Sequence, residues 1–267
     1  MSTAIWTGLT ASILYLLATL VAGRQLAGNL PLQRSSFLSL GVLALLFHLC
    51  ALWHVVVGDD GLRLGLFPVA SLIGATGVIV VSVTSIYRPL EWVSVLVYPF
   101  SAVTLPAALW IDTGMSPHQL PHGLGAHVLL SVLAYAVLAL AACQAVLVMI
   151  QHHQLKDGHI RGIMRMFPPI QLMETMLFEL LWTGMVLLTL AILAGFLYVE
   201  DLLAQHLVHK TFFTLASWTI FAILLAGRHL MGWRGVTAVR LTLSGFAILL
   251  LGFFGSQFVL EMLLQRS

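Results

Sequence analysis

Long apolar runs, separated by short polar segments, dominate the chain. A transmembrane helix needs about 20 predominantly apolar residues, and eight windows meet this requirement. They are Ala4–Ala22, Ser36–Val57, Leu66–Tyr87, Trp92–Ile111, Gly123–Ile150, Leu177–Val199, Thr211–Ala226 and Leu241–Leu260. The pattern predicts an all-α fold, a polytopic membrane helical bundle of about eight transmembrane helices. Because no repeat of about 20–50 residues is evident, we expect residues 1–267 to form a single integral membrane domain.

The segment between the fifth and sixth windows contains a strong helix breaker. Phe167-Pro168-Pro169 must end any helix that reaches it, since proline lacks a backbone N–H and its ring clashes with the preceding turn. The short, partly apolar stretch Ile170–Met176 follows. We expect this stretch to lie at the membrane interface before the sixth span enters the bilayer.

The composition excludes a water-soluble protein. Of 267 residues, 60% are hydrophobic and 8% are charged, with a mean hydropathy of +1.02, whereas soluble domains carry roughly 25% charged residues. The expected surroundings are therefore membrane lipid. A net charge of +2 without any Lys/Arg run gives no reason to expect a nucleic-acid partner. Cys50 and Cys143 lie in apolar runs without CxxC spacing, which argues against a disulfide scaffold or a zinc ribbon.

The distribution of basic residues between the spans predicts the orientation. Cytoplasmic loops carry an excess of Lys and Arg, and nine of the twelve basic residues fall on one side of the predicted bundle. These nine are Arg24, Arg34, Arg88, Lys156, Arg161, Arg165, Arg228, Arg234 and Arg240, against Arg63, Lys210 and Arg266 on the other side. Both termini are therefore expected to face the periplasm or external side.

Histidines are the main candidates for chemistry, because the spans contain almost no charged side chains of the kind that mark ion or proton routes. Seven of the eleven fall in or near the predicted outer half: His48, His54, His118, His122, His127, His206 and His209. Neutral imidazole ligates haem iron, and a pair on facing helices can hold a b-type haem. A lone histidine near a helix end is more often a hydrogen-bonded or interfacial residue, so position alone leaves each of them open.

Helical geometry separates two of these histidines. His48 and His54 are six residues apart, which is about 240° around a helix of 3.6 residues per turn. They cannot both face the same ligand, so one is expected to point inward and the other laterally. Most tryptophans lie near span ends, where interfacial belts place them, but Trp218 falls in the middle of a span.

Three blocks in the second half of the chain carry a family resemblance. They lie mainly within residues 123–260 and are Gly125-Ala126-His127-Val128 with Leu133-Ala134-Tyr135-Ala136; Pro168-Pro169-Ile170 with Met173-Glu174, Gly184 and Gly195; and Gly232-Trp233-Arg234-Gly235 followed by Gly245-Phe246 and Phe253-Phe254-Gly255. Their order and spacing are similar to those of the cytochrome c assembly family, the CcsA- and CcmC-type proteins that handle haem at bacterial inner membranes.

The resemblance implies haem b as a cofactor and a multi-pass location in a bacterial inner membrane. In the family an external histidine that opens a helix is an axial haem ligand, which here corresponds to His127. His48 is the preferred intramembrane partner, with His206 or His209 as alternatives. Trp218, together with Lys210, could align with the tail of the family's external motif. The expected partners are haem and other cytochrome c biogenesis or haem-pathway proteins.

The sequence also departs from the family's synthase members. Those members carry a tryptophan-rich external motif with a Trp-Asp pair, which the segment from Phe196 to Thr211 lacks, and no histidine follows the last span. The chain therefore resembles the shorter YpjD- or HemX-like branch. We expect a haem-binding or haem-handling protein that is not an enzyme and not the haem lyase. The alternatives are a non-catalytic membrane scaffold or regulator of haem biosynthesis or membrane-protein assembly, and a small-solute transporter, which would need more buried charge.

Overall fold

The computed structural model describes residues 2–27, 34–58, 61–111, 124–156, 167–198, 205–259 and 261. These residues confirm the all-α prediction, and within them eight helices are long and apolar enough to cross a membrane. The long helices are α1 (Ser2–Ala27), α2 (Arg34–Val56), α3 (Leu66–Tyr87), α4 (Ser94–Trp110), α5 (Leu124–Lys156), α6 (Ile170–Tyr198), α7 (Gln205–Met231) and α8 (Val236–Leu250).

Short elements complete the fold. A 3-10 turn, η1 (Glu91–Val93), leads into α4, and the strands β1 (Val57–Gly58) and β2 (Gly61–Leu62) pair as an antiparallel hairpin between α2 and α3. Helix α8 continues through a π-helical segment, η3 (Leu251–Gly255), into α9 (Ser256–Phe258). The eighth span is therefore one continuous helical rod whose hydrogen-bonding register changes near its end.

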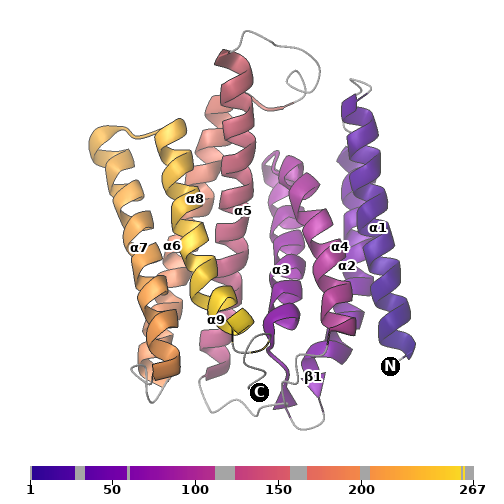
Figure 1. Cartoon of the computed structure of the whole chain (residues 1–267). Helices are drawn as coiled ribbons and strands as arrows, with labels where there is room; N and C mark the ends of the chain where they lie inside the picture. Colours follow the sequence, from indigo (N-terminus) through magenta and orange to yellow (C-terminus); the bar gives the residue numbers. More distant parts are fainter. Residues whose placement is uncertain are drawn as a thin grey trace.

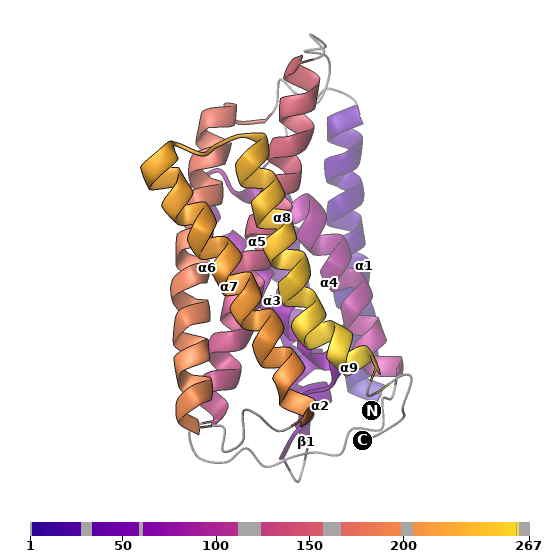
Figure 2. The ribbon, with the colours of Figure 1, turned by 60° about the vertical axis from the view of Figure 1, so that its left-hand side comes forward.

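The helices pack as two groups of four, α1–α4 and α5–α8 (Figure 1). Helix α3 of the first group contacts α5 of the second, and α5 also packs against α6 and α8. The start of α1 and the end of α9 lie at the same end of the bundle as the β1–β2 hairpin, whereas the α7–α8 turn lies at the opposite end (Figures 1 and 2). The junction between the two groups is where the site described below is found.

The stretch Ile170–Met176 is continuous with the sixth span. It forms the first turns of α6, with Met173 and Met176 buried in the core. The Pro169 carbonyl accepts hydrogen bonds from the N–H groups of Leu172 and Met173. Proline blocks a helix that arrives from its N-terminal side but is well tolerated where a helix begins, so α6 begins directly after Pro169.

The turn between α7 and α8 gives the Gly232-Trp233-Arg234-Gly235 block a structural explanation. Gly232 and Gly235 have φ values of 67° and 59°, in the region that only glycine adopts without strain. The Gly235 N–H donates to the Glu174 carboxylate of α6 over 2.9 Å. The Trp233 ring packs directly on Gly227, where a Cβ would collide with it. This block therefore joins three helices.

Arg228 reinforces the same joint. Its guanidinium donates to the Trp233 carbonyl over 3.3 Å and lies 4.6 Å from the centroid of the Phe178 ring on α6. A cation over an aromatic face gains electrostatic attraction. The most family-like motif of the chain thus holds the end of the bundle opposite to the β1–β2 hairpin.

The outer surface of the bundle is apolar. Large hydrophobic side chains such as Leu20, Leu46 and Leu193 are more than half exposed along the helices. Exposed apolar surface of this extent is compatible with lipid and not with water. The structure therefore supports the same conclusion as the hydropathy of the chain, a polytopic membrane protein.

Candidate functional site

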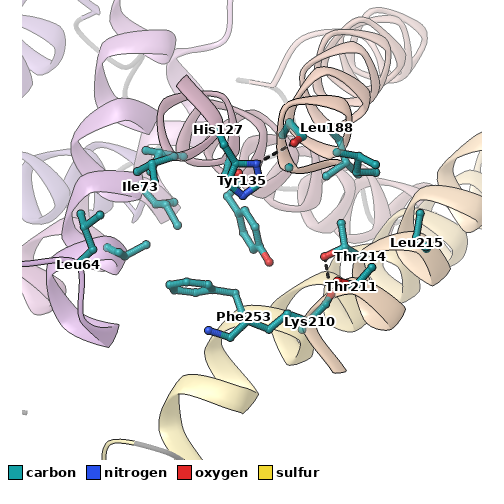
Figure 3. Close-up of a pocket in the computed structure, with 18 of the residues that line it drawn as sticks. Leu64, Ile73, His127, Tyr135, Leu188, Lys210, Thr211, Thr214, Leu215 and Phe253 are labelled. Atoms are coloured by element: carbon teal, nitrogen blue, oxygen red, sulfur yellow. Dashed lines mark hydrogen bonds between the residues drawn. The ribbon is translucent and has the colours of Figure 1, made fainter. Parts of the chain in front are cut away.

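A cavity of about 250 Å³ lies at the junction of the two helix groups, near the end of the bundle where α5 and α7 begin (Figure 3). Its lining is apolar except for one imidazole, one ammonium group and a few hydroxyls. The described lining residues are Leu64, Val69, Ile73, His127, Val128, Ser131, Val132, Tyr135, Leu188, Ala191, Ile192, Gly195, Phe196, Lys210, Thr211, Thr214, Leu215, Gly252 and Phe253. Helices α3, α5, α6 and α7 and the η3 segment all contribute.

His127, in the first turn of α5, is held in one orientation by α6. Its Nδ1 lies 2.8 Å from the backbone oxygen of Ala191. A carbonyl oxygen only accepts hydrogen bonds, so the neutral ring carries its proton on Nδ1 and donates it there. Nε2 is left with a free lone pair, and no residue in the described ranges hydrogen-bonds to it. Histidines that ligate metals are oriented in this way, by donating the other ring N–H to a carbonyl or carboxylate.

Gly195 makes this orientation possible. A Cβ at position 195 would lie 3.1 Å from Cε1 and 3.3 Å from Nδ1 of His127. Both separations are shorter than ordinary carbon–carbon or carbon–nitrogen contacts, which begin near 3.5 Å. Because Gly195 has no side chain, α6 can approach the imidazole closely enough for the Ala191 carbonyl to accept a hydrogen bond from Nδ1.

An aromatic wall lies deeper in the cavity. Tyr135 is two turns after His127 on α5, and its ring lies 6.1 Å from that of Phe253 in an edge-on arrangement. The Tyr135 hydroxyl donates to the Leu249 carbonyl over 2.9 Å, just before α8 changes to π-helical pairing. A π-helical turn leaves a carbonyl without its usual partner, and such turns are frequent at functional sites. Tyr135 thus stabilises the irregular turn that brings Phe253 into the cavity.

Polar contacts gather beside the cavity, where Gln257 of α9 and Glu261 meet α7 and the start of α3. The Lys210 ammonium donates to Oε1 of Gln257 over 2.9 Å and lies 5.5 Å from the centroid of the Phe253 ring. The carboxylate oxygens of Glu261 accept from the Leu66 N–H over 3.1 and 3.2 Å. Glu261 therefore caps the start of α3 in the first helix group, whereas Gln257 contacts α7 in the second.

His48 lies elsewhere. It is fully buried in the first helix group, where Nε2 is 2.8 Å from the Ser71 hydroxyl and Nδ1 is 3.3 Å from the Tyr15 hydroxyl. His54 is exposed, so the prediction that one of the pair points inward and the other laterally is confirmed. His48 does not line the cavity, because α2 packs on α1 and α3, and it is α3 that contacts α5. The structure does not bring His48 and His127 together there.

The other candidate residues either do not line the cavity or have side chains that the structure does not describe. His209 is exposed on α7. His206 falls in the first turn of α7, where the structure describes the backbone alone, and His118 and His122 lie outside the described residues. Trp218 donates its indole N–H to the Thr189 hydroxyl over 3.0 Å, which ties α7 to α6 about one turn beyond the cavity.

Comparison with known proteins decides the family. The family described as "Cytochrome C assembly protein" matches residues 38–264. The chain belongs to the cytochrome c assembly family. The match begins in α2 and so includes much of the first helix group, although the sequence blocks that resemble the family lie in the second half. Cavity residues from α3, such as Ile73, are therefore part of the family-matched region.

Individual members of the cytochrome c assembly family and their relatives give the same result. The chain is 30% identical to "Inner membrane protein YpjD" of Escherichia coli (strain K12), over 92% of this chain and 94% of that protein. It is 22% identical to "Cytochrome c biogenesis protein CcsA" of Guillardia theta, over 62% of this chain and 61% of that protein. No solved structure gives a significant match. With eight apolar helices, the chain is a multi-pass inner-membrane protein.

Proposed function

We propose that this protein binds haem b in the cavity between the two helix groups, where His127 would ligate the iron, and passes or presents haem during cytochrome c assembly. The observation that carries the proposal is the His127 ring, whose Nδ1 donates to Ala191 and whose Nε2 is free at the cavity wall. Membership of the cytochrome c assembly family supports haem as the ligand. Haem would supply the iron centre to which an imidazole nitrogen bonds.

The cavity residues fit such a ligand. The lining is apolar and includes the Phe253 and Tyr135 rings, which suits a flat porphyrin face. A volume of about 250 Å³ lies just below the range of roughly 300–1,000 Å³ for small-molecule sites. Because the cavity is partly open, a flat ligand can lie in it with one edge outside.

The protein's own residues would then perform two tasks. The Ala191 carbonyl fixes the tautomer of His127 and the direction of Nε2, as outer-shell acceptors do for metal ligands. The apolar walls keep water from the ligand.

Among the described lining residues His127 carries the one imidazole, and both ring nitrogens of His48 already contact hydroxyls. The proposal therefore rests on His127 alone, and a single protein ligand favours release of haem to a partner.

We further propose that the protein does not itself form the thioether bonds of c-type cytochromes. The segment from Phe196 to Thr211 contains no tryptophan and no Trp-Asp pair, so it lacks the tryptophan-rich motif that would position the vinyl groups of haem. Rate enhancement by positioning requires the reacting atoms to be held near their reactive geometry. Haem binding and handover need only the cavity and its ligand.

The proposed orientation places the cavity at the periplasmic side. The sequence predicts nine of the twelve basic residues on one side of the bundle. Those that the structure describes, including Arg24, Arg88 and Arg228, lie near the ends of α1, α3 and α7, opposite to the end that contains His127. The positive-inside rule assigns the basic end to the cytoplasm.

The test is the visible absorption spectrum of the detergent-purified protein before and after incubation with haem. We expect a Soret band and b-type α and β bands on reduction, at a ratio near one haem per chain. The His153→Ala variant is a matched control, since His153 lies on the same helix as His127 but is exposed and bonds to the Met149 carbonyl of its own helix. A spectrum without haem bands after incubation would contradict the proposal and favour the non-catalytic scaffold.

A further inference from the structure

Lys210 is an unusual residue for its position. It lies within a helix long and apolar enough to span a membrane, and it lines the same cavity as His127. A lysine near the end of a span usually extends its ammonium group toward water, so a lysine that lines an apolar cavity is unusual. The side chain is half-buried and its ammonium group is close to the Phe253 ring, 5.5 Å from the centroid. The ammonium group of Lys210 therefore lies at the cavity wall, beside Phe253.

Among the described residues, Lys210 does not use all the hydrogen-bond donors of its ammonium group. An ammonium group has three donors, and the structure gives it one acceptor, the neutral amide oxygen of Gln257 at 2.9 Å. Glu261 acts on Lys210 electrostatically, but its carboxylate oxygens are bonded to the Leu66 N–H. As far as the described residues go, two donors therefore remain for an anionic group that enters the cavity.

We infer that Lys210 binds a carboxylate of the ligand held in this cavity, and that Gln257 positions the ammonium group for this contact. The ligand class is an apolar body that carries a carboxylate. The inference rests on the proposed function where the ligand is haem, whose propionate arms are carboxylates. A fatty acid from the membrane carries the same group and is the other source of this chemistry.

The geometry gives the two polar residues different roles. His127 and Lys210 come from different helices and reach the cavity from different walls, with Phe253 beside Lys210 (Figure 3). A molecule with a metal centre and carboxylate arms can satisfy both, whereas a metal-free porphyrin can satisfy Lys210 alone. Binding of a metal-free porphyrin therefore isolates the contribution of Lys210 from that of His127.

The experiment is a fluorescence titration of the detergent-purified full chain with metal-free protoporphyrin IX and with its dimethyl ester. Wild type is expected to bind the dicarboxylate about tenfold more tightly than the ester, as a charge-assisted hydrogen bond is of this order. Lys210→Met should abolish the difference between the two probes, and Lys210→Arg should restore most of it. Arg63→Met is the matched control, because Arg63 is an exposed cation near the same end of the bundle, and it should behave as wild type.

Three further arms complete the test. His127→Ala should keep the preference for the dicarboxylate, because that probe has no iron, and should lose the haem bands. Haem bands retained by His127→Ala with this preference intact would overturn the proposed haem ligand and not the role of Lys210. If oleate competes with the probe in wild type but not in Lys210→Met, while the two porphyrins bind equally, the carboxylate contact stands and its source is lipid. Equal binding of both porphyrins by wild type and by Lys210→Met, without competition from oleate, overturns the inference.

Discussion

Gly195→Ala tests whether the position of the His127 ring depends on the close approach of α6. The added Cβ would lie 3.1 Å from Cε1 and 3.3 Å from Nδ1 of the ring. To restore ordinary contact distances near 3.5 Å, the imidazole must move by a few tenths of an ångström. Such a movement lengthens the 2.8 Å hydrogen bond to Ala191 and turns Nε2 away from its present direction.

The expected effect on haem is large and the expected effect on folding is small. Loss of an outer-shell partner typically lowers metal affinity by about 10–100-fold. Because the hydrogen bond from His127 to Ala191 would be weakened but not removed, we expect the haem affinity to fall near the lower limit, about tenfold. Alanine is the better helix former by up to about 1 kcal/mol, which offsets the steric cost, so the haem-free protein should remain as stable as wild type within about that amount.

The assay pairs haem titration, followed at the Soret band, with thermal unfolding of the haem-free protein. Gly23→Ala is the matched control, since a Cβ at this helical glycine of α1 would meet nothing within 4 Å. It should alter neither the haem affinity nor the Soret maximum. If Gly195→Ala binds haem as tightly as Gly23→Ala, with the same spectrum, then the close contact does not control the ligand and the argument for His127 loses its geometric basis.

Three other predictions concern His48, Glu261 and the orientation of the bundle. His48→Leu leaves two buried hydroxyls without a partner and should lower the unfolding free energy by roughly 1 kcal/mol while the haem spectrum stays unchanged; a changed spectrum would restore His48 as a ligand. Glu261→Ala removes the cap at Leu66 and should cost about 1 kcal/mol, seen as a lower melting temperature, whereas an unchanged one would show that the C-terminal segment does not hold α3. Alkaline phosphatase fused after Ser267 should be active and after Arg161 inactive, and the reverse pattern would invert the orientation.

The number and approximate limits of the helices could be predicted because the membrane imposes a minimum apolar length on every span. Leu66–Tyr87 begins and ends as predicted. The errors occur where polar residues extend a helix beyond its apolar core, as at Gln205–Lys210 of α7, or where a helix begins directly after proline, as at Ile170. Hydropathy identifies the part of a helix inside the bilayer but does not mark the hydrogen-bonded turns at its ends.

The site could be predicted only in part, because position along a span gives the depth of a side chain and not the helix that it faces. His127 was identified by its place near the start of a span and within a family-like block, and it lines the cavity. His48 lies deeper in its own span but faces Tyr15 and Ser71, and only packing between helices reveals this. The role of Gly195 depends on the distance between α5 and α6, which the sequence does not contain.

The identity of the iron ligand is tested most directly by replacing His127 with glycine and supplying free imidazole. His127→Gly removes the ring but leaves the cavity, so added imidazole can occupy the vacated space and ligate the iron. We expect purified His127→Gly to retain less haem than wild type and than His153→Ala, and added imidazole to restore the Soret maximum and the bound haem. Retention of haem by His127→Gly at the level of His153→Ala, with an unchanged spectrum and no response to imidazole, would contradict the account.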